Sequence, residues 1–403
     1  MTAHTTHPAW PVPAAPERER TGHLLLRAWC VFVLFAAFAA PAWVEAFGPV
    51  VAGLVAAAAA IVSAAVWMRV RPAFNGRRLP WFVLAYVAWA GLSLLWSGQP
   101  ATTWALLALT AGQGLFVAAV LTWRELVAAV GAALKWMLGL SLVFELVVAV
   151  VVGAPLGAGF AVPADAASSP WSLGGLFRGG PLLGLAGDAA ALGAVSAVAV
   201  IVFGIRVASA IARVPAWLWL ALAFFLLVRS ESVIASLALG AVAAVLVTVL
   251  LMRTAGRAGE RTKYYLLFTA LGAVAGVLLW WWRDVVFAGA HSVWADAAAR
   301  TGWVGVVLVA GIQLSFVWRA WFFAIDRPRW DLRADRPYTP LTLLPTLTAT
   351  VLLVQGLADV GPLGLWGWLL IVTLGTKITQ APLVGVGPAE QSAALERGEA
   401  VTA

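Results

Sequence analysis

Charged residues are scarce in this 403-residue sequence: Asp, Glu, Lys and Arg together make up 11% of it, whereas 63% of the residues are hydrophobic. The mean hydropathy is +0.93. A soluble protein of this length could not bury so much apolar surface, so the composition excludes that class. We predict an all-α, polytopic membrane protein, because helices satisfy their own backbone hydrogen bonds in lipid.

Cysteine is almost absent as well. The single cysteine, Cys30, lies inside the first apolar segment, which excludes an internal disulfide and a cysteine-based metal site. The sequence contains no HExxH, P-loop or nucleotide-binding fingerprint and no carboxylate cluster, so we expect neither a metal nor another cofactor. The net charge of +8 comes with arginines in short loops between apolar runs, which is a topology signal and does not indicate binding of nucleic acid.

Long apolar runs are the main feature that is present. Runs of about 17 to 22 residues can cross a bilayer as helices. Twelve such runs are predicted to span the membrane, at residues 24–44, 48–67, 80–96, 103–122, 132–152, 182–204, 215–229, 232–252, 264–282, 301–318, 340–357 and 364–380. No internal repeat and no second domain are indicated.

Basic residues are distributed unevenly over the loops between these runs. If the N-terminus is inside, only four of the 26 Lys and Arg residues fall in outer loops, namely Arg178, Arg229, Arg283 and Arg300. Loops rich in Lys and Arg stay on the cytoplasmic side, so the bias predicts that both termini are cytoplasmic. The expected organisation is a disordered cytoplasmic segment (1–23), a transmembrane domain (24–380) and a cytoplasmic tail (381–403).

Two predicted outer loops, 153–181 and 283–300, are long enough to form a site, and the second contains His291. The planar guanidinium of arginine pairs with phosphate oxygens, so a basic pocket beside lipid suits a phosphorylated amphiphile. Each outer arginine could instead anchor a helix end at the lipid headgroups. Trp294 and Asp296 follow His291 closely, but at most two of the three share one helix face, so the histidine could equally be structural.

Four segments of the chain carry a family resemblance. They read WSLGGLFRGGPLLGLAGDAAALG from Trp171, LVRSESVIASLALG from Leu227, GAHSVWADAAARTGWVG from Gly289 and AIDRPRWDLRADRPYTPLTLLP from Ala324. The last two resemble the HAHNAWLDVWLQLGVVG and AVDRPRWDLRADRPYSALTLLP types of segment in the O-antigen ligase and polymerase family of membrane proteins, in its actinobacterial branch. Together with the predicted spans, the resemblance covers nearly the whole chain.

The resemblance implies an activity and a place in the cell. Family members transfer a glycan from an undecaprenyl-diphosphate carrier to an acceptor hydroxyl, on the outer face of the bacterial cytoplasmic membrane. The departing diphosphate needs cations, and the acceptor hydroxyl needs a base. His291 matches the family's loop histidine and is the expected catalytic base, without a metal. The expected substrate-binding residues are Arg178, Arg229, Arg283, Arg300, Trp294 and Asp296. The expected partners are the lipid-linked glycan, a glycan or envelope acceptor and membrane lipids, with no role for nucleic acid.

Several positions depart from the family pattern. The family's second loop histidine is Gly289 here, its asparagine is Ser292, and its usual arginine in the first outer loop is Pro181. A long outer loop that many relatives carry before the histidine is absent. Whether the chain is an active glycan ligase or polymerase therefore stays open beside two alternatives. One is a non-catalytic member that binds lipid-linked glycan or scaffolds envelope enzymes, and the other is a transporter. Arginines too scattered to share one diphosphate would favour the non-catalytic alternative.

Overall fold

The computed structural model describes residues 17–72, 76, 79–98, 100–161, 170–209, 216–255, 259–286, 292–325, 339–359 and 364–379. Within these ranges the regular structure is helical, apart from one isolated antiparallel bridge between Leu156 and Ser172. Seven of the described helices are long and apolar enough to cross a membrane, and five shorter apolar helices accompany them. The predicted all-α fold with several membrane-compatible helices is confirmed.

Thirteen α-helices and four short turns are described along the chain. The α-helices are α1 (Glu17–Phe38), α2 (Ala40–Val70), α3 (Trp81–Ser93), α4 (Ala101–Val120), α5 (Trp123–Val147), α6 (Ala189–Ala208), α7 (Ala216–Arg229), α8 (Val233–Thr254), α9 (Glu260–Trp281), α10 (Arg283–Val286), α11 (Val293–Ile325), α12 (Leu344–Gly356) and α13 (Leu365–Thr379). The short turns are η2 (Val148–Val152), η3 (Ala158–Phe160), η4 (Gly184–Ala186) and η5 (Pro340–Leu343).

Each predicted apolar run overlaps one of the long or shorter apolar helices, but some boundaries differ. Residues 17–23, which were expected in a disordered segment, form the start of α1, while residues 1–16 lie outside the described part of the chain. The run predicted at 182–204 is α-helical only from Ala189, where the side chain of Asp188 accepts a hydrogen bond from the backbone N–H of Ala191 and caps α6. The predicted tail, 381–403, also lies outside the described residues.

Glycines interrupt two of the longest helices. Gly48 in α2 has φ +83° and is followed by Pro49, and Gly302 in α11 has φ +67°. Glycine adopts positive φ without the steric cost that other residues incur, so the chain changes direction at these two points. The break at Gly302 divides α11 into a short segment, 293–301, and a longer helix that follows it. The short segment belongs to the predicted outer loop 283–300, which is therefore partly helical.

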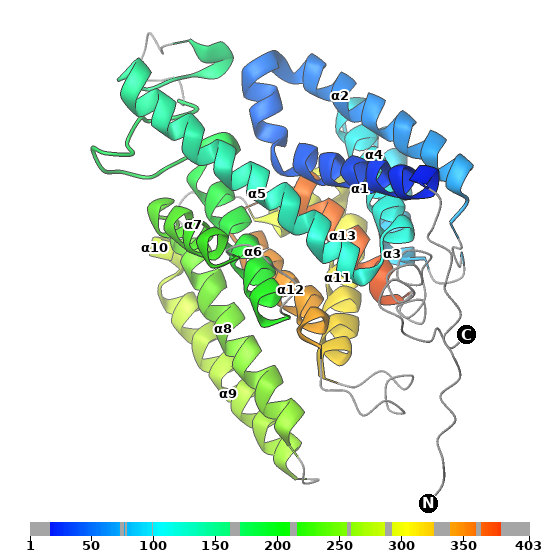
Figure 1. The fold of residues 1–403 in the computed structure, drawn as a ribbon. Coiled ribbons are helices and arrows are strands. Elements are labelled where there is room, and N and C mark those ends of the chain that lie inside the picture. The colour runs from blue at the N-terminus through cyan, green and yellow to red at the C-terminus, as the bar shows by residue number, and fades with distance from the viewer. Residues whose placement is uncertain are drawn as a thin grey trace, which may run out of the picture.

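The centre of the bundle is formed by α6, α12 and α13, which neighbouring helices cover (Figure 1). Lys377 of α13 is buried, and its ammonium group donates to the carbonyl oxygens of Ala118 at 3.3 Å and Leu121 at 2.5 Å. These carbonyls belong to the C-terminal end of α4, where backbone acceptors lack helical partners and a cation is favourable. The ammonium group therefore ties α13 to α4.

One apolar helix, α9, lies outside this core. No residue of α9 is buried, and Figure 1 shows it beside α8 along one edge of the molecule. Its side-chain contacts include Tyr265 and Phe268 against Trp321 of α11. Aromatic residues stand at both of its ends, with Tyr264 and Tyr265 at one and the Trp280–Trp282 run at the other. Apolar flanks between two aromatic ends are typical of a helix surrounded by lipid.

Candidate functional site

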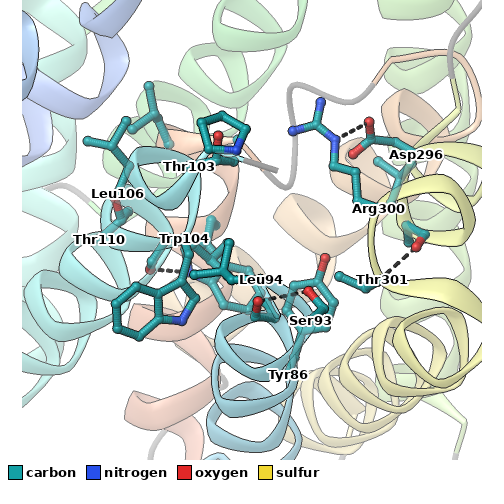
Figure 2. A pocket seen from close by; sticks show the side chains of 18 residues that line it. Tyr86, Ser93, Leu94, Thr103, Trp104, Leu106, Thr110, Asp296, Arg300 and Thr301 are labelled. Carbon is teal, nitrogen blue, oxygen red and sulfur yellow. Dashed lines mark hydrogen bonds and ion pairs between the residues drawn. The ribbon is translucent and has the colours of Figure 1, made fainter. Parts of the chain in front are cut away.

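A cavity of about 230 Å³ lies between α3, α4, α11 and α13 (Figure 2). It is at the end of the bundle where α3 ends and α4, α11 and α13 begin, which the topology prediction places on the outer side. Most of its wall is apolar. Its polar and aromatic groups are Tyr86 and Ser93 of α3, Thr103, Trp104 and Thr110 of α4, Asp296, Arg300 and Thr301 of α11, and Trp368 of α13.

The charged part of the wall is a pair on the short first segment of α11. The Nε–H of Arg300 donates to Asp296 Oδ1 at 2.6 Å, and the two residues lie one helical turn apart. The side chains are 40% and 26% exposed, so both remain accessible from the cavity. Figure 2 shows the terminal nitrogens of Arg300 pointing away from Asp296. The carboxylate therefore fixes the guanidinium while leaving two nitrogens for a ligand oxygen.

The rest of the wall suits a polar ligand with an apolar portion. The indole of Trp104 donates its N–H to the carbonyl of Val87 at 3.0 Å, which fixes the ring at the edge of the cavity. Tyr86 and Trp368 pack edge to face, with ring centroids 5.8 Å apart. Threonine and serine hydroxyls supply donors and acceptors. Aromatic rings beside hydroxyls and one ion pair form a pocket that can hold a sugar or another hydroxyl-rich headgroup.

Arg178, on the loop that precedes α6, and Arg229, the last residue of α7, both lie away from this cavity. Arg178 donates to the carbonyl oxygen of Gly153 at 3.2 Å, and Arg229 donates to that of Gly175 at 3.2 Å. Arg229 also lies 3.7 Å from the carboxylate of Glu231. Both guanidinium groups thus bind backbone of the predicted outer loop 153–181. The contacts hold the loop in place, and neither arginine lines the cavity.

Beneath that loop is a buried carboxylate, Glu145 of α5, which is 1% exposed. Its Oε1 accepts from the backbone N–H groups of Leu183 at 3.1 Å and Gly184 at 2.8 Å, and its Oε2 accepts from the Ser172 hydroxyl at 2.8 Å. Glu145 was not among the predicted site residues. The available signal was an isolated acidic residue within an apolar run, where such residues are rare and usually have a role.

The remaining predicted site residues are dispersed. Arg283 lies 3.4 Å from Asp284, and its guanidinium carbon is 4.4 Å from the centre of the Trp280 ring, an arrangement that anchors a helix end. Trp294 is partly buried and packs against the hydrophobic core. His291 lies outside the described residues. The convergence of four arginines on one pocket is therefore not observed, and Arg300 with Asp296 is the part of the predicted set that lines the cavity.

Comparisons with protein-family models, curated proteins and solved structures find no match to this chain. The class that the structure supports is an all-helical, membrane-embedded protein. The likeness to O-antigen ligases and polymerases rests on the four sequence segments alone.

Proposed function

We propose that the chain is a multi-pass protein of the bacterial cytoplasmic membrane that takes a lipid-linked glycan at its outer face and transfers the glycan to an acceptor hydroxyl. One observation carries this function. The charged wall of the cavity, Asp296 and Arg300, comes from the segment 289–305 that resembles the histidine segment of O-antigen ligases and polymerases. Cavity and resemblance thus point to the same stretch of chain, although each was obtained without the other.

Two residues of this stretch would have different roles in such a reaction. The acceptor oxygen forms a bond to the anomeric carbon of the donor sugar as the bond from that carbon to the diphosphate breaks. The guanidinium of Arg300, oriented by Asp296 at 2.6 Å, would stabilise the negative charge on the departing diphosphate. His291, five residues before Asp296 in sequence, would accept the proton of the acceptor hydroxyl.

A second function, binding of lipid-linked glycan without transfer, is favoured by the contacts of the other arginines. Arg178 and Arg229 bind loop carbonyls, and Arg283 lies against Asp284 and Trp280. Among the described residues, these contacts leave Arg300 as the cation at the cavity, whereas a diphosphate leaving group would use more than one. Envelope glycan profiling of a deletion strain separates the two functions, because loss of a glycan linkage indicates transfer, whereas an unchanged profile with retained binding of lipid-linked glycan indicates binding alone.

The proposed topology, twelve spans with both termini in the cytoplasm, can be tested by labelling single cysteines in a Cys30→Ser background. A membrane-impermeant maleimide added to sealed cells should modify Asp165→Cys, in the predicted outer loop, and spare Asp335→Cys, in the arginine-rich loop. Both positions should react after the membrane is permeabilised. Labelling of position 335 in sealed cells would reverse the orientation and remove the cavity from the outer face.

The role of Arg300 can be tested with a substitution that keeps its charge. Arg300→Lys should weaken binding of a lipid-linked glycan by about tenfold, because an ammonium group cannot both stay paired with Asp296 and offer a planar pair of donors. The measurement is a binding titration with purified protein. The matched control is Arg124→Lys, an exposed arginine at the other end of the bundle, which should bind normally. Equal affinity of Arg300→Lys and wild type would show that the diphosphate does not use this guanidinium.

A further inference from the structure

Three cationic side chains from three helices lie near one another around α5. They are near the end of the bundle that is opposite to the cavity. They are Arg27 of α1, Lys135 of α5 and Arg206 of α6. Arg206 lies within electrostatic reach of both Arg27 and Lys135. It also packs against Gly131, one turn before Lys135: a methyl group at that glycine would lie 2.5 Å from Arg206 Nη1. The absence of a side chain at Gly131 thus makes room for the guanidinium.

None of these three side chains has an anionic partner among the described residues. Lys135 lies over the ring of Trp219, with Nζ 5.3 Å from the ring centre, which is a contact with an aromatic face. Glu125, the acidic residue in the first turn of α5, is occupied by His23 at 2.6 Å and by the hydroxyl of Thr122 at 3.0 Å. Partly buried cations that repel one another are unfavourable unless an anion binds among them.

An apolar groove begins beside the same cluster. It lies between α1 and α5, has a volume of about 580 Å³ and includes Arg27 in its wall. The rest of its wall is almost entirely apolar, with Phe32 and Phe35 on one side and Trp136 on the other. Trp136 is 61% exposed, so the groove opens on the outside of the bundle, where lipid would lie. A ligand with an anionic headgroup and an apolar chain thus fits here, with the headgroup at the cations and the chain in the groove.

We propose that this cluster and groove bind one anionic glycerophospholipid, with its phosphate among Arg27, Lys135 and Arg206 and an acyl chain along the α1–α5 groove. The site is at the end of the bundle where α5 begins and α6 ends, which the topology prediction places on the cytoplasmic side. Basic pockets between helices on that side are suited to anionic headgroups. The site is separate from the glycan cavity and does not depend on the proposed transfer activity.

The ligand class is tested first with the intact protein in zwitterionic micelles. Phosphatidylglycerol should raise the midpoint of thermal unfolding and appear as a bound molecule in native mass spectrometry. Phosphatidylcholine with the same acyl chains lacks the net charge, and inorganic phosphate lacks the chains, so neither should reproduce the effect. Equal stabilisation by inorganic phosphate would indicate that the site binds a simple anion and does not need the acyl chains. Equal stabilisation by phosphatidylcholine would indicate that the three cations do not contribute to lipid binding. Either result overturns the proposal.

Variants then test the residues. Each cation near a membrane surface contributes about fivefold to the affinity for anionic lipid. The double variant Lys135→Gln/Arg206→Gln should therefore bind phosphatidylglycerol about 25-fold more weakly. Gly131→Ala keeps all three charges but displaces Arg206, so it should weaken binding by about fivefold. The control is Arg69→Gln, an exposed arginine on α2, which should bind as wild type does.

Folding of the variants is measured without added lipid. Removing two of the three repelling cations in the double variant should leave the unfolding midpoint in zwitterionic micelles unchanged or raise it. Gly131→Ala, which alters no charge, provides a result even if the double variant fails to fold. Wild-type affinity for phosphatidylglycerol in Gly131→Ala, with Arg206 shown to be displaced, would overturn the proposal.

Discussion

Replacing His291 with alanine is expected to lower glycan transfer by about 10²- to 10⁴-fold, the usual contribution of a general base. A histidine with a pKa near the reference value of about 6.5 is largely neutral at neutral pH and can accept a proton. Gly289 and Ser292 stand where the O-antigen ligase type of segment, which this stretch resembles, has a second histidine and an asparagine, so little in the segment can replace the base. The measurement is glycan profiling of a deletion strain complemented with each variant.

The companion variant His291→Gln separates catalysis from positioning. Glutamine keeps a hydrogen-bonding side chain but cannot act as a base. The glutamine variant, like the alanine variant, should therefore fail to restore transfer. Membrane levels and the thermal unfolding of both variants should match wild type, which excludes misfolding as the cause. Restoration of the glycan by glutamine alone would limit the histidine to positioning, and an envelope glycan that neither variant alters would favour the non-catalytic function.

Replacing Glu145 with alanine is expected to destabilise the protein by about 3–5 kcal/mol. The carboxylate accepts three hydrogen bonds, from Ser172, Leu183 and Gly184, at a position that is 1% exposed. Alanine would leave these donors without an acceptor in a place that water does not reach, and each such group costs about 1–3 kcal/mol. Thermal unfolding in detergent and proteolysis of the 153–181 loop would report the change.

The matched control is Glu145→Gln, which keeps the shape of the side chain and one acceptor oxygen. That oxygen can still accept from Leu183 and Gly184, and the new amide can donate to Ser172, so we expect a loss of about 1 kcal/mol. An alanine variant as stable as wild type, with an intact loop, would mean that the three donors find other partners and that Glu145 does not hold the loop.

The positions of the helices could be predicted from the sequence because each is a long apolar run. The breaks within them depend on single residues. Gly48 is the first residue of the run predicted at 48–67, and Gly302 is the second residue of the run predicted at 301–318. The late start of α6 was not predicted, since it depends on the cap that Asp188 provides. Residues 182–187 are apolar enough to suggest a helix, but Gly184 and Gly187 adopt positive φ there.

The candidate site was only partly predictable. Asp296 and Arg300 have the spacing of one helical turn, and they do form a pair. The partners of Arg178 and Arg229 could not be predicted, because they are backbone carbonyls brought near by the fold of an irregular loop. Glu145 is similar, since its backbone partners lie 38 and 39 residues further along the chain. Hydropathy locates a helix, whereas such contacts depend on tertiary structure.

The isolation of α9 has a mechanical consequence. Its 22 residues give a length of about 33 Å, close to the roughly 30 Å hydrocarbon thickness of a bilayer. With no buried residue, α9 is expected to change its tilt at a lower cost in packing than a helix of the core, since its contacts are mainly those with α8 and Trp321. Its aromatic ends follow the two membrane surfaces, and its C-terminal end leads through α10 to the chain that carries His291. A thinner or thicker bilayer is thus expected to shift the ends of α9 relative to the core.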